Sequence, residues 1–431
     1  MSRSSAAPRS AIAVVLIASL ALAACGSGSS KNNNSMTGRG PISIWYSNNQ
    51  EEVAWGKTMV SAWNAGHPNE TVTAQEIPAG TTSEEVISAA ITAGNAPCLI
   101  LNTSPAAVPQ FQRQGGLVAL DSFPDGRSYI EARSGDVAKQ YQSTDGKFYQ
   151  LPWKSNPVMI FYNKTLFAKA GLDPNNPPLR TYAEFLDTAR KLVAAKVSQT
   201  AIWPAPTSEF FQSWFDFYPL YAAETGGTQL VANGTPTFNS DAGRRVATFW
   251  RTLYAEGLAS KEKYTGDSFA DAKAAMAIVG PWAIAVYQGK VDWGSVPVPT
   301  STGKNPSDVW TFSDAKNIAM YSACKNRATA WDVLKFATST EQDGAFLTTT
   351  GQMPMRTGLP STYADYFTQH PTYRSFADQA ARTVEVPNIP GSVKVWQTFR
   401  DAYSASVISG SQDPAKALAA AAQAISGQVN G

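Results

Sequence analysis

Short apolar runs alternate with amphipathic stretches near the start of the chain's main body, and this pattern constrains the fold more than any other feature. Three runs are predicted to be β-strands: residues 42–46, 71–75 and 98–101. A helix is predicted in each of the two gaps, with Ser83 expected to cap the second one. Because strand–helix alternation is typical of a parallel sheet with helices on both faces, we expect an α/β fold.

The length of the chain predicts more than one domain. With 431 residues, of which 43% are hydrophobic, the chain exceeds the size at which a single core stops growing. Pro152 and Pro157 lie close together in a segment that suits a crossing between domains better than a central strand. A second crossing is predicted near residues 309–312. We therefore expect two domains that are connected by such crossings.

The first 24 residues have the pattern of a removable export signal. Arg3 and Arg9 precede an apolar run at residues 11–23, which is too short to remain as a membrane-spanning helix. The run ends in Leu-Ala-Ala before Cys25, which resembles the bacterial lipobox, where the cysteine is lipidated and becomes the new amino terminus. The Gly-, Ser- and Asn-rich residues that follow Cys25, up to residue 40, predict a flexible tether. The sequence therefore predicts an extracytoplasmic protein that is lipid-anchored to the outer face of the bacterial cell membrane.

The charge balance argues against a nucleic-acid partner. The chain has 35 Lys and Arg and 33 Asp and Glu residues, and the leader contains two of the basic residues and no acidic one. The mature protein is therefore close to neutral, whereas nucleic-acid-binding proteins carry a basic surface. Zinc is disfavoured as well, because His67 and His370, the two histidines, are each followed by proline and lie far from the cysteines. We expect neither a metal nor a cofactor.

Trp282 follows a predicted buried strand at residues 276–279, which Gly280 and Pro281 terminate. Ligands of α/β proteins usually bind at the carboxyl ends of strands, and there a tryptophan offers a flat apolar surface. The alternative is that Trp282 fills the core. Residues 209–221 contain seven aromatic side chains, more than one helix face can bury, so some are expected to line a cavity.

Short motifs occur in order in five segments. Residues 93–97 are Ala-Gly-Asn-Ala-Pro, 161–164 are Phe-Tyr-Asn-Lys, 275–282 end in Gly-Pro-Trp, 334–339 are Leu-Lys-Phe-Ala-Thr-Ser before Met-Pro-Met-Arg, and 386–388 are Val-Pro-Asn before Trp396. In order and spacing they resemble the ABC-importer solute-binding lipoproteins, the family that includes maltose-binding protein. The resemblance covers roughly residues 41–427.

This resemblance implies a periplasmic-binding-protein-like fold with two lobes, each with a central mixed sheet flanked by helices, and three crossings between them. The implied lobes are residues 41–154 plus 312–358 and residues 155–311 plus 359–431. The implied function is to bind a carbohydrate between the closing lobes and deliver it to a membrane permease, as a monomer and without catalysis. The sequence departs from the family at Cys98, at Ser313-Asp314 and at Asn156, so maltose is not carried over as the ligand.

The resemblance also bears on the cysteines and on the site. By spacing alone Cys98 and Cys324 are as easily two unrelated buried thiols, but the implied topology brings them together and implies a disulfide. It places sugar-stacking platforms at Trp282 and Trp396, and Trp214 is a further candidate. Loops at strand ends and crossings supply the polar candidates: Asn48, Asn49, Asn102, Ser104, Asn156, Asp314 and Arg356. Each of these polar residues is alternatively an ordinary turn residue.

Two other functions are considered. The same fold binds other solutes, such as a polyol, an amino sugar or a glycerophosphodiester, and Arg356 makes a phosphate conceivable. A surface-anchored glycoside hydrolase needs two carboxylates that face one bond, whereas Asp314 is the one acid that we place at the cleft. We therefore expect a binding protein rather than an enzyme.

Overall fold

The computed structural model describes residues 36–79, 82–204, 215–389 and 391–429. The predicted leader, Cys25 and most of the predicted tether lie outside the described residues, as does Trp214. The predictions made for those positions therefore stay predictions.

The first sheet has six strands in the order β13-β4-β12-β3-β1-β2. These strands are β1 Ile42–Tyr46, β2 Val72–Glu76, β3 Leu99–Thr103, β4 Leu151–Ser155, β12 Lys316–Met320 and β13 Met353–Pro354. Strand β1 pairs in parallel with β2 and β3, which confirms the predicted α/β start of the chain. Strand β12 is antiparallel to β3 and β4, and β13 is antiparallel to β4, so the sheet is mixed.

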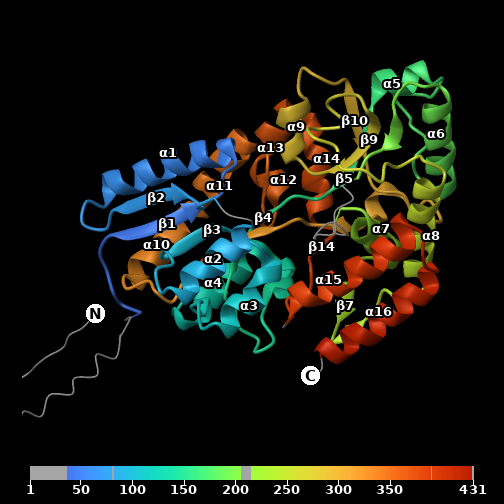
Figure 1. Ribbon diagram of the computed structural model, residues 1–431. Coiled ribbons are helices and arrows are strands. Elements are labelled where there is room, and N and C mark those ends of the chain that lie inside the picture. The colour runs from blue at the N-terminus through green and yellow to red at the C-terminus, as the bar shows by residue number, and fades with distance from the viewer. Residues whose placement is uncertain (1–35, 80–81, 205–214, 390, 430–431) are drawn as a thin grey trace, which may run out of the picture. The chain divides into compact units, whose positions relative to one another are not determined.

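Helices cover both faces of this sheet (Figure 1). They are α1 Gln50–Gly66, α2 Ser83–Thr92, α3 Val108–Arg113, α4 Gly126–Ser134, α10 Arg327–Ala337 and α11 Thr340–Thr350, with short 3-10 turns at Pro105–Ala107, Leu120–Ser122 and Gly135–Tyr141. Along β3, Leu99 and Leu101 join one core while Ile100 joins another, as expected for a strand buried on both faces. One detail differs from the prediction: the cap of α2 is Thr82, whose side chain accepts from Glu85 N, and not Ser83.

The second sheet has four strands in the order β10-β5-β9-β6. They are β5 Met159–Asn163, β6 Thr200–Ile202, β9 Ala274–Val279 and β10 Trp293–Val296. Strand β5 is antiparallel to β9 and β10, whereas β6 is parallel to β9. Ile160 and Phe161 alternate between two cores on the two faces of β5. This sheet is therefore also mixed and buried on both sides.

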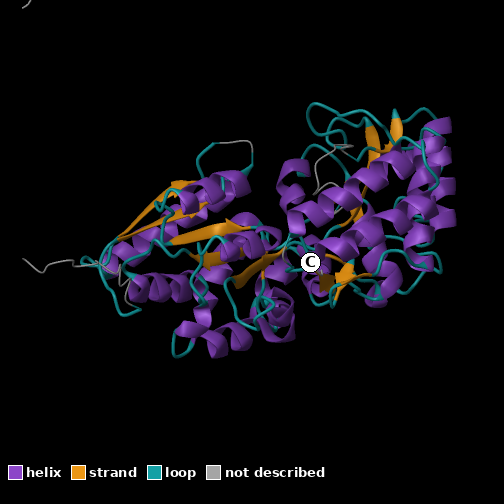
Figure 2. Cartoon of the chain, turned by 60° about the horizontal axis from the view of Figure 1, so that its bottom comes forward, coloured by secondary structure: helices purple, strands orange, loops and turns teal. Residues whose placement is uncertain are grey.

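Helices also pack around the second sheet (Figure 2), and they come from two parts of the chain, residues 164–287 and 359–429. They are α5 Lys164–Lys169, α6 Tyr182–Ala194, α7 Phe217–Thr225, α8 Asp241–Ala255, α9 Trp282–Tyr287, α12 Leu359–Thr362, α13 Ala364–Gln369, α14 Pro371–Ala380, α15 Ser392–Tyr403 and α16 Pro414–Val429, with a π-turn at Ser404–Ile408 and a 3-10 turn at Pro306–Asp308. A capping box starts α6, since Thr181 and Glu184 cap each other's backbone N–H groups. A small hairpin is formed by β7 Val231–Ala232 and β8 Thr235–Pro236.

The chain passes between the two sheets after β4, before β12 and after β13. The first two crossings run side by side, because Asn156 N donates to Ser313 O and Val158 N donates to Phe312 O. The hydroxyls of Ser155 and Ser313 also bond at 2.7 Å. Strand β11 Thr311–Phe312, at the second crossing, pairs in parallel with β14 Thr383–Val384.

Cys98 and Cys324 form a disulfide bond, with Cα atoms 4.5 Å apart and a sequence separation of 226 residues. Cys98 precedes β3 and Cys324 follows β12, and these two strands are antiparallel neighbours. The pairing that the family topology implied is therefore present in the structure, and it links two adjacent inner strands of the first sheet.

Candidate ligand-binding site

A cavity of about 310 Å³ opens at the carboxyl end of β9. The residues that line it are Ile202, Trp203, Pro204, Phe215, Trp250, Gly266, Asp267, Ser268, Phe269, Ala277, Ile278, Val279, Trp282 and Tyr287. Six of these 14 residues have aromatic rings, and the last three residues of β9 supply aliphatic wall. A cavity that is mainly apolar with few polar groups is the usual form of a small-molecule site.

Trp282 is the first residue of α9 and lies directly after the Gly280-Pro281 turn, as the sequence predicted. The side chain is half-buried, lines the cavity and packs against the cores on both faces of the second sheet. The ring meets the Phe215 ring edge-on, with centroids 6.1 Å apart and an interplanar angle of 87°. Trp282 therefore is neither a wholly buried core residue nor a free surface residue, which suits a platform for a ligand.

Asp267 is the one charged residue in the cavity lining, and its carboxylate holds the local turn. Oδ1 accepts hydrogen bonds from the N–H groups of Phe269 and Ala270, at 3.0 and 2.9 Å. Burial, and secondarily the charge of Asp267, raise the pKa of the Tyr287 hydroxyl far above its usual value. The Tyr287 hydroxyl is therefore neutral, and the cavity presents a neutral aromatic surface with one acidic edge.

Trp396 occupies a different position. It is 1% exposed, belongs to the main core of the second sheet and packs near Tyr218 and Phe399. The ring does not line the cavity that Trp282 lines. In this conformation Trp396 is a core residue, so its role as a second platform stays a prediction that requires a rearrangement of its neighbours.

The polar candidates that follow β1 and β3 mostly have local structural positions. Asn49 caps α1, with Oδ1 accepting from Glu52 N at 2.9 Å. Ser104 is buried and precedes a 3-10 turn, while Asn48 is exposed and Asn102 half-buried. These four residues lie at the carboxyl ends of parallel neighbours β1 and β3, so the structure brings them to one edge of the first sheet.

Asn156 belongs to a buried polar cluster at the first crossing. Its Nδ2 donates to Gln352 Oε1 at 3.0 Å, and Gln352 Nε2 donates to Glu52 Oε1 at 2.8 Å. Glu52 also accepts from the Ser47 hydroxyl at 2.6 Å and forms an ion pair with Lys154. The cluster therefore ties the start of α1 to the first crossing and to the residue before β13.

The surroundings of Glu52 keep its carboxyl ionised. Burial is the largest influence on the Glu52 carboxyl and favours its neutral form, but the Lys154 ammonium and the hydrogen bonds from Lys154, Ser47 and Gln352 together hold the pKa of Glu52 below its usual value. Burial lowers the pKa of Lys154. The Lys154 and Glu52 side chains are only 3% and 4% exposed, so in this conformation Lys154 pairs with Glu52 away from solvent.

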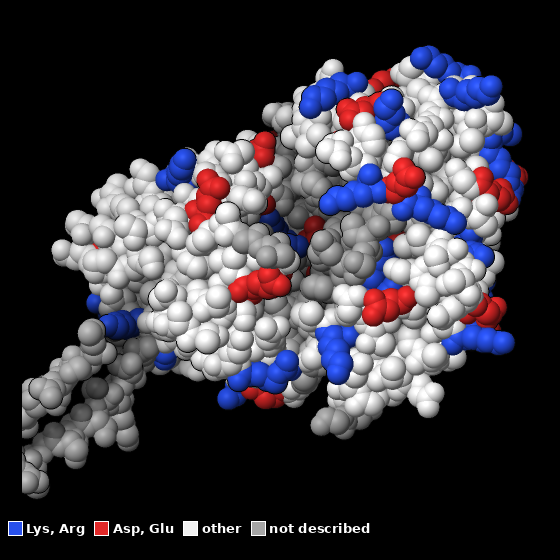
Figure 3. All heavy atoms as spheres, viewed as in Figure 1, with Lys and Arg blue, Asp and Glu red and all other residues white. Residues whose placement is uncertain are grey.

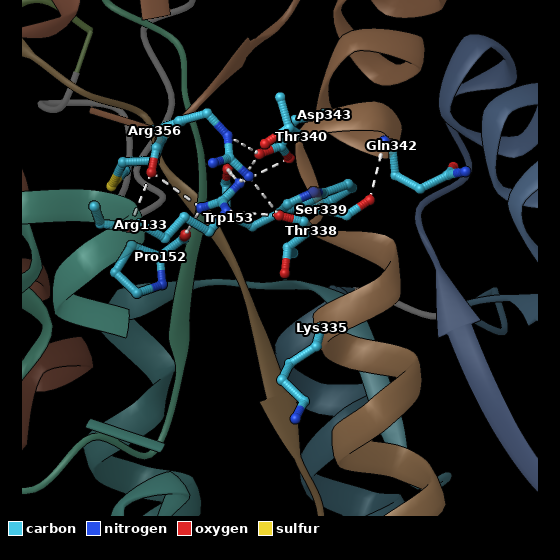
Figure 4. Close-up of polar contacts among 12 residues, drawn as sticks. Arg133, Pro152, Trp153, Lys335, Thr338, Ser339, Thr340, Gln342, Asp343 and Arg356 are labelled. Carbon is cyan, nitrogen blue, oxygen red and sulfur yellow. Dashed lines mark hydrogen bonds and ion pairs between the residues drawn. The ribbon is translucent and has the colours of Figure 1, made fainter. Parts of the chain in front are cut away.

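Asp314 and Arg356 also form ion pairs within the protein. Asp314 pairs with Lys316 at 2.9 Å and has a positive φ of 41°. Arg356 donates from Nε to Asp343 Oδ2 and from Nη2 to Thr338 O, both at 2.8 Å. Arg133 of α4 binds the same carboxylate (Figure 4), and its Nη2 lies 2.8 Å from Asp343 Oδ1. Arg356 thus helps to fix the third crossing to the first sheet.

The charged side chains seen in Figure 3 are scattered or in mixed groups, and a recess in this face has both basic and acidic atoms at its floor. Such a surface lacks the single-sign field that draws polyanions.

Comparison with known proteins decides the family. The sequence profile of the family described as bacterial extracellular solute-binding protein matches residues 46–344. The chain belongs to this family. Its members are solute-binding proteins, so the function is binding outside the cytoplasm rather than catalysis. Among the described residues, no helix of this solute-binding protein is long and apolar enough to cross a membrane.

Characterised relatives are similar along most of their length. The maltodextrin-binding protein MdxE of Bacillus subtilis is 24% identical over 70% of this chain and 71% of its own. The diacetylchitobiose binding protein DasA of Streptomyces coelicolor is 23% identical over 82% and 83%. The crystal structure of the cyclic alpha-maltosyl-1,6-maltose binding protein from Arthrobacter globiformis superposes with a TM-score of 0.76 at 23% identity, and covers 91% of this chain and all of that one. The structural likeness confirms the predicted periplasmic-binding-protein-like fold of this solute-binding protein.

Sequence reasoning missed several residues of the candidate site. Glu52, Lys154 and Gln352 form the polar cluster, but each comes from a different segment and only the fold joins them. Trp203 and Phe215 complete the aromatic wall of the cavity in this solute-binding protein. For Phe215 the signal was available, because it lies in the aromatic-rich segment that was expected to line a cavity.

Proposed function

We propose that this solute-binding protein binds a carbohydrate and delivers it to the permease of an ABC importer. The observation that carries the proposal is the position of Trp282, half-buried on the wall of an aromatic cavity beside Phe215. Sugars present apolar C–H faces, and a flat aromatic ring can cover such a face while nearby polar groups bond the hydroxyls. The names of the relatives, which bind maltodextrin, diacetylchitobiose and a cyclic maltosyl-maltose, support the same class of ligand.

The pairing of basic residues favours a neutral ligand over a glycerophosphodiester. Lys154 pairs with Glu52, Lys316 with Asp314 and Arg356 with Asp343. A phosphate that bound one of these three cations would compete with its carboxylate partner, and for a buried pair such as Lys154–Glu52 the loss of one partner costs about 3–5 kcal/mol. A linear polyol is also less suited, because it has no ring face to lie on Trp282. An N-acetylated or other uncharged amino sugar remains within the proposed class.

We further propose that residues 41–154 plus 312–358 and residues 155–311 plus 359–431 form two lobes that close around the ligand. The crossings that join the two sheets are short, and the first two are hydrogen-bonded to each other. Hinges between domains usually consist of a few residues at the ends of secondary-structure elements, and these crossings have that form. Asn48, Asn49, Asn102, Ser104 and Asn156 are proposed to meet the sugar hydroxyls from the first lobe on closure. Small-angle scattering should show a smaller radius of gyration at saturating ligand, and an unchanged radius argues against closure.

A thermal-shift panel tests the ligand class. Maltotriose, diacetylchitobiose, glycerol and glycerophosphocholine are each added to the purified protein, because a ligand that binds the folded state raises the melting temperature by mass action. We expect a shift with at least one oligosaccharide and none with glycerophosphocholine. A shift with glycerophosphocholine alone would replace the carbohydrate by a phosphodiester as the proposed ligand.

A further inference from the structure

Gly280 stands between β9 and α9 and is buried under the Trp282 side chain. It is not among the glycines with a positive φ, so the backbone at this position does not by itself require glycine. The reason for glycine at position 280 must therefore be sought in space rather than in conformation.

The space beside Gly280 is filled by the ring of Trp282. A Cβ atom at position 280 would lie 2.0 Å from Cζ3, 2.6 Å from Cε3 and 2.7 Å from Cη2 of that ring. Non-bonded carbon atoms prefer separations of about 3.5–4.0 Å, so a methyl group would overlap the six-membered part of the indole. The ring thus occupies the space that a side chain at position 280 would need.

We propose that Gly280 is a positioning residue for the ligand platform: its missing side chain lets the Trp282 indole fold back over the end of β9 and form a wall of the cavity. This inference rests on the proposed function only in treating Trp282 as the platform. The geometric part, that residue 280 sets the position of the ring, stands without any ligand.

The backbone around Gly280 is held, so a clash would move the ring. Val279 pairs with Met159 of β5, and Gly280 O accepts from Ala283 N at 3.1 Å in the first turn of α9. Pro281, between them, has a fixed φ of −63°. The Trp282 side chain is the freely rotating part, and it would have to shift by roughly 1–1.5 Å to restore normal contact with a methyl group.

Fluorine NMR of the full-length protein that contains 5-fluorotryptophan tests the geometric part. The Trp282 resonance is assigned by its loss in Trp282→Phe. We expect Gly280→Ala to shift this resonance, whereas the matched control Gly66→Ala, at a position where a Cβ meets no atom within 4 Å, leaves it in place. An unmoved Trp282 resonance in a folded Gly280→Ala protein overturns the proposal.

A double-mutant cycle of melting temperatures tests the proposal even if Gly280→Ala folds poorly. In the Trp282→Ala background the overlapping ring is absent, so adding Gly280→Ala should cause no further loss of melting temperature. A loss as large as in the wild-type background would show that the methyl group meets something other than the ring, and the proposal would fall.

Titration with maltotriose then separates this inference from the proposed function. We expect Gly280→Ala to weaken binding at least tenfold, as Trp282→Ala does, with Gly66→Ala unchanged. If the resonance shifts but Trp282→Ala binds maltotriose as tightly as the wild type, the platform role fails and the positioning role stands. If Trp282→Ala loses binding while a folded Gly280→Ala does not, the proposed function stands and the positioning role fails.

Discussion

Arg356 donates a hydrogen bond from Nε to Oδ2 of Asp343 across 2.8 Å, and the Asp343 side chain has no exposed surface. Arg133 binds the same carboxylate and also donates to the carbonyl groups of Pro152 and Met355 (Figure 4). Through these two arginines, one buried acid therefore connects α11 with α4, β4 and the third crossing. The arginine that the sequence offered for a ligand phosphate is used to hold the third crossing.

Removing this acid should destabilise the protein strongly. We expect Asp343→Ala to lower the free energy of unfolding by about 3–5 kcal/mol, because two arginines are left in a buried site without their counter-ion. Urea denaturation measures the change. The control is Glu256→Ala, which removes the partner of Arg190 in an ion pair whose side chains are 46% and 39% exposed, and it should cost about 0–1 kcal/mol. Equal effects of the two substitutions would contradict the structural role of Asp343.

The disulfide should stabilise the chain as a whole. Because Cys98 and Cys324 are 226 residues apart, their bond removes a large loop-closure entropy from the unfolded state. We expect the Cys98→Ser/Cys324→Ser double variant to lose about 3–5 kcal/mol. Thermal unfolding of both proteins measures this, and reductant should lower the melting temperature of the wild type alone. Two thiols that alkylate in the folded wild type without reductant would show that the bond is not formed.

Glu385 should make stability depend on pH. Its two carboxylate oxygens accept from the N–H groups of Ala315 and Val386, and burial raises the pKa of this carboxyl from 4.5 to about 8. The folded state thus holds a proton that the unfolded state releases. The resulting stability is complete below about pH 4.5 and is lost as the pH rises through about 8.

Replacement of Glu385 by glutamine tests the sign of this effect. The side chain in Glu385→Gln cannot ionise, so only the wild type should lose stability as this group titrates. The free energy of unfolding of the variant, minus that of the wild type, should therefore increase by about 2–4 kcal/mol between pH 5 and pH 9. Urea denaturation at several pH values gives both curves. Lys316 and Asp314 are the charged groups that also act on Glu385. Parallel curves for the two proteins would refute the raised pKa.

Lipidation at Cys25 should decide where the protein is found. We expect the wild type to fractionate with membranes and Cys25→Ala to be released, since stable anchoring depends on the acyl chains. Immunoblotting of membrane and soluble fractions measures this, with Ser29→Ala in the tether as a control that keeps both the anchor and the disulfide. Release of both the wild type and Cys25→Ala would exclude the anchor.

Local features of the fold were predictable from sequence, because their causes lie within a few residues. Thr181 and Glu184 form a capping box within four consecutive residues, and Ser339 caps α11 by accepting from Gln342 N. The Gly280-Pro281 stop likewise ends β9 where it was expected. The α/β arrangement at the start of the chain was predicted from the alternation of strands and helices, since one helix separates each strand there from the next.

Features that depend on distant pairing were not predictable in the same way. Glu52 and Lys154 are 102 residues apart, and no local sequence pattern around either residue indicates that they form a pair. Trp396 lies in a motif that resembles that of a stacking tryptophan, yet the packing of Tyr218 and Phe399 around it leaves the ring 1% exposed. Whether a side chain near a cleft faces a ligand or the core depends on the volume of its neighbours, which periodicity does not report.

Calorimetric titration of the wild type and Trp282→Ala tests the central claim, that a carbohydrate binds against Trp282. The titrant is the oligosaccharide that gives the largest thermal shift in the panel, and melting temperatures of both proteins are recorded beside the affinities. The account predicts binding that is at least about tenfold weaker in Trp282→Ala, a loss of 1.4 kcal/mol or more, with a smaller change in folding stability. Equal affinity in the two proteins would contradict it and return Trp282 to the core.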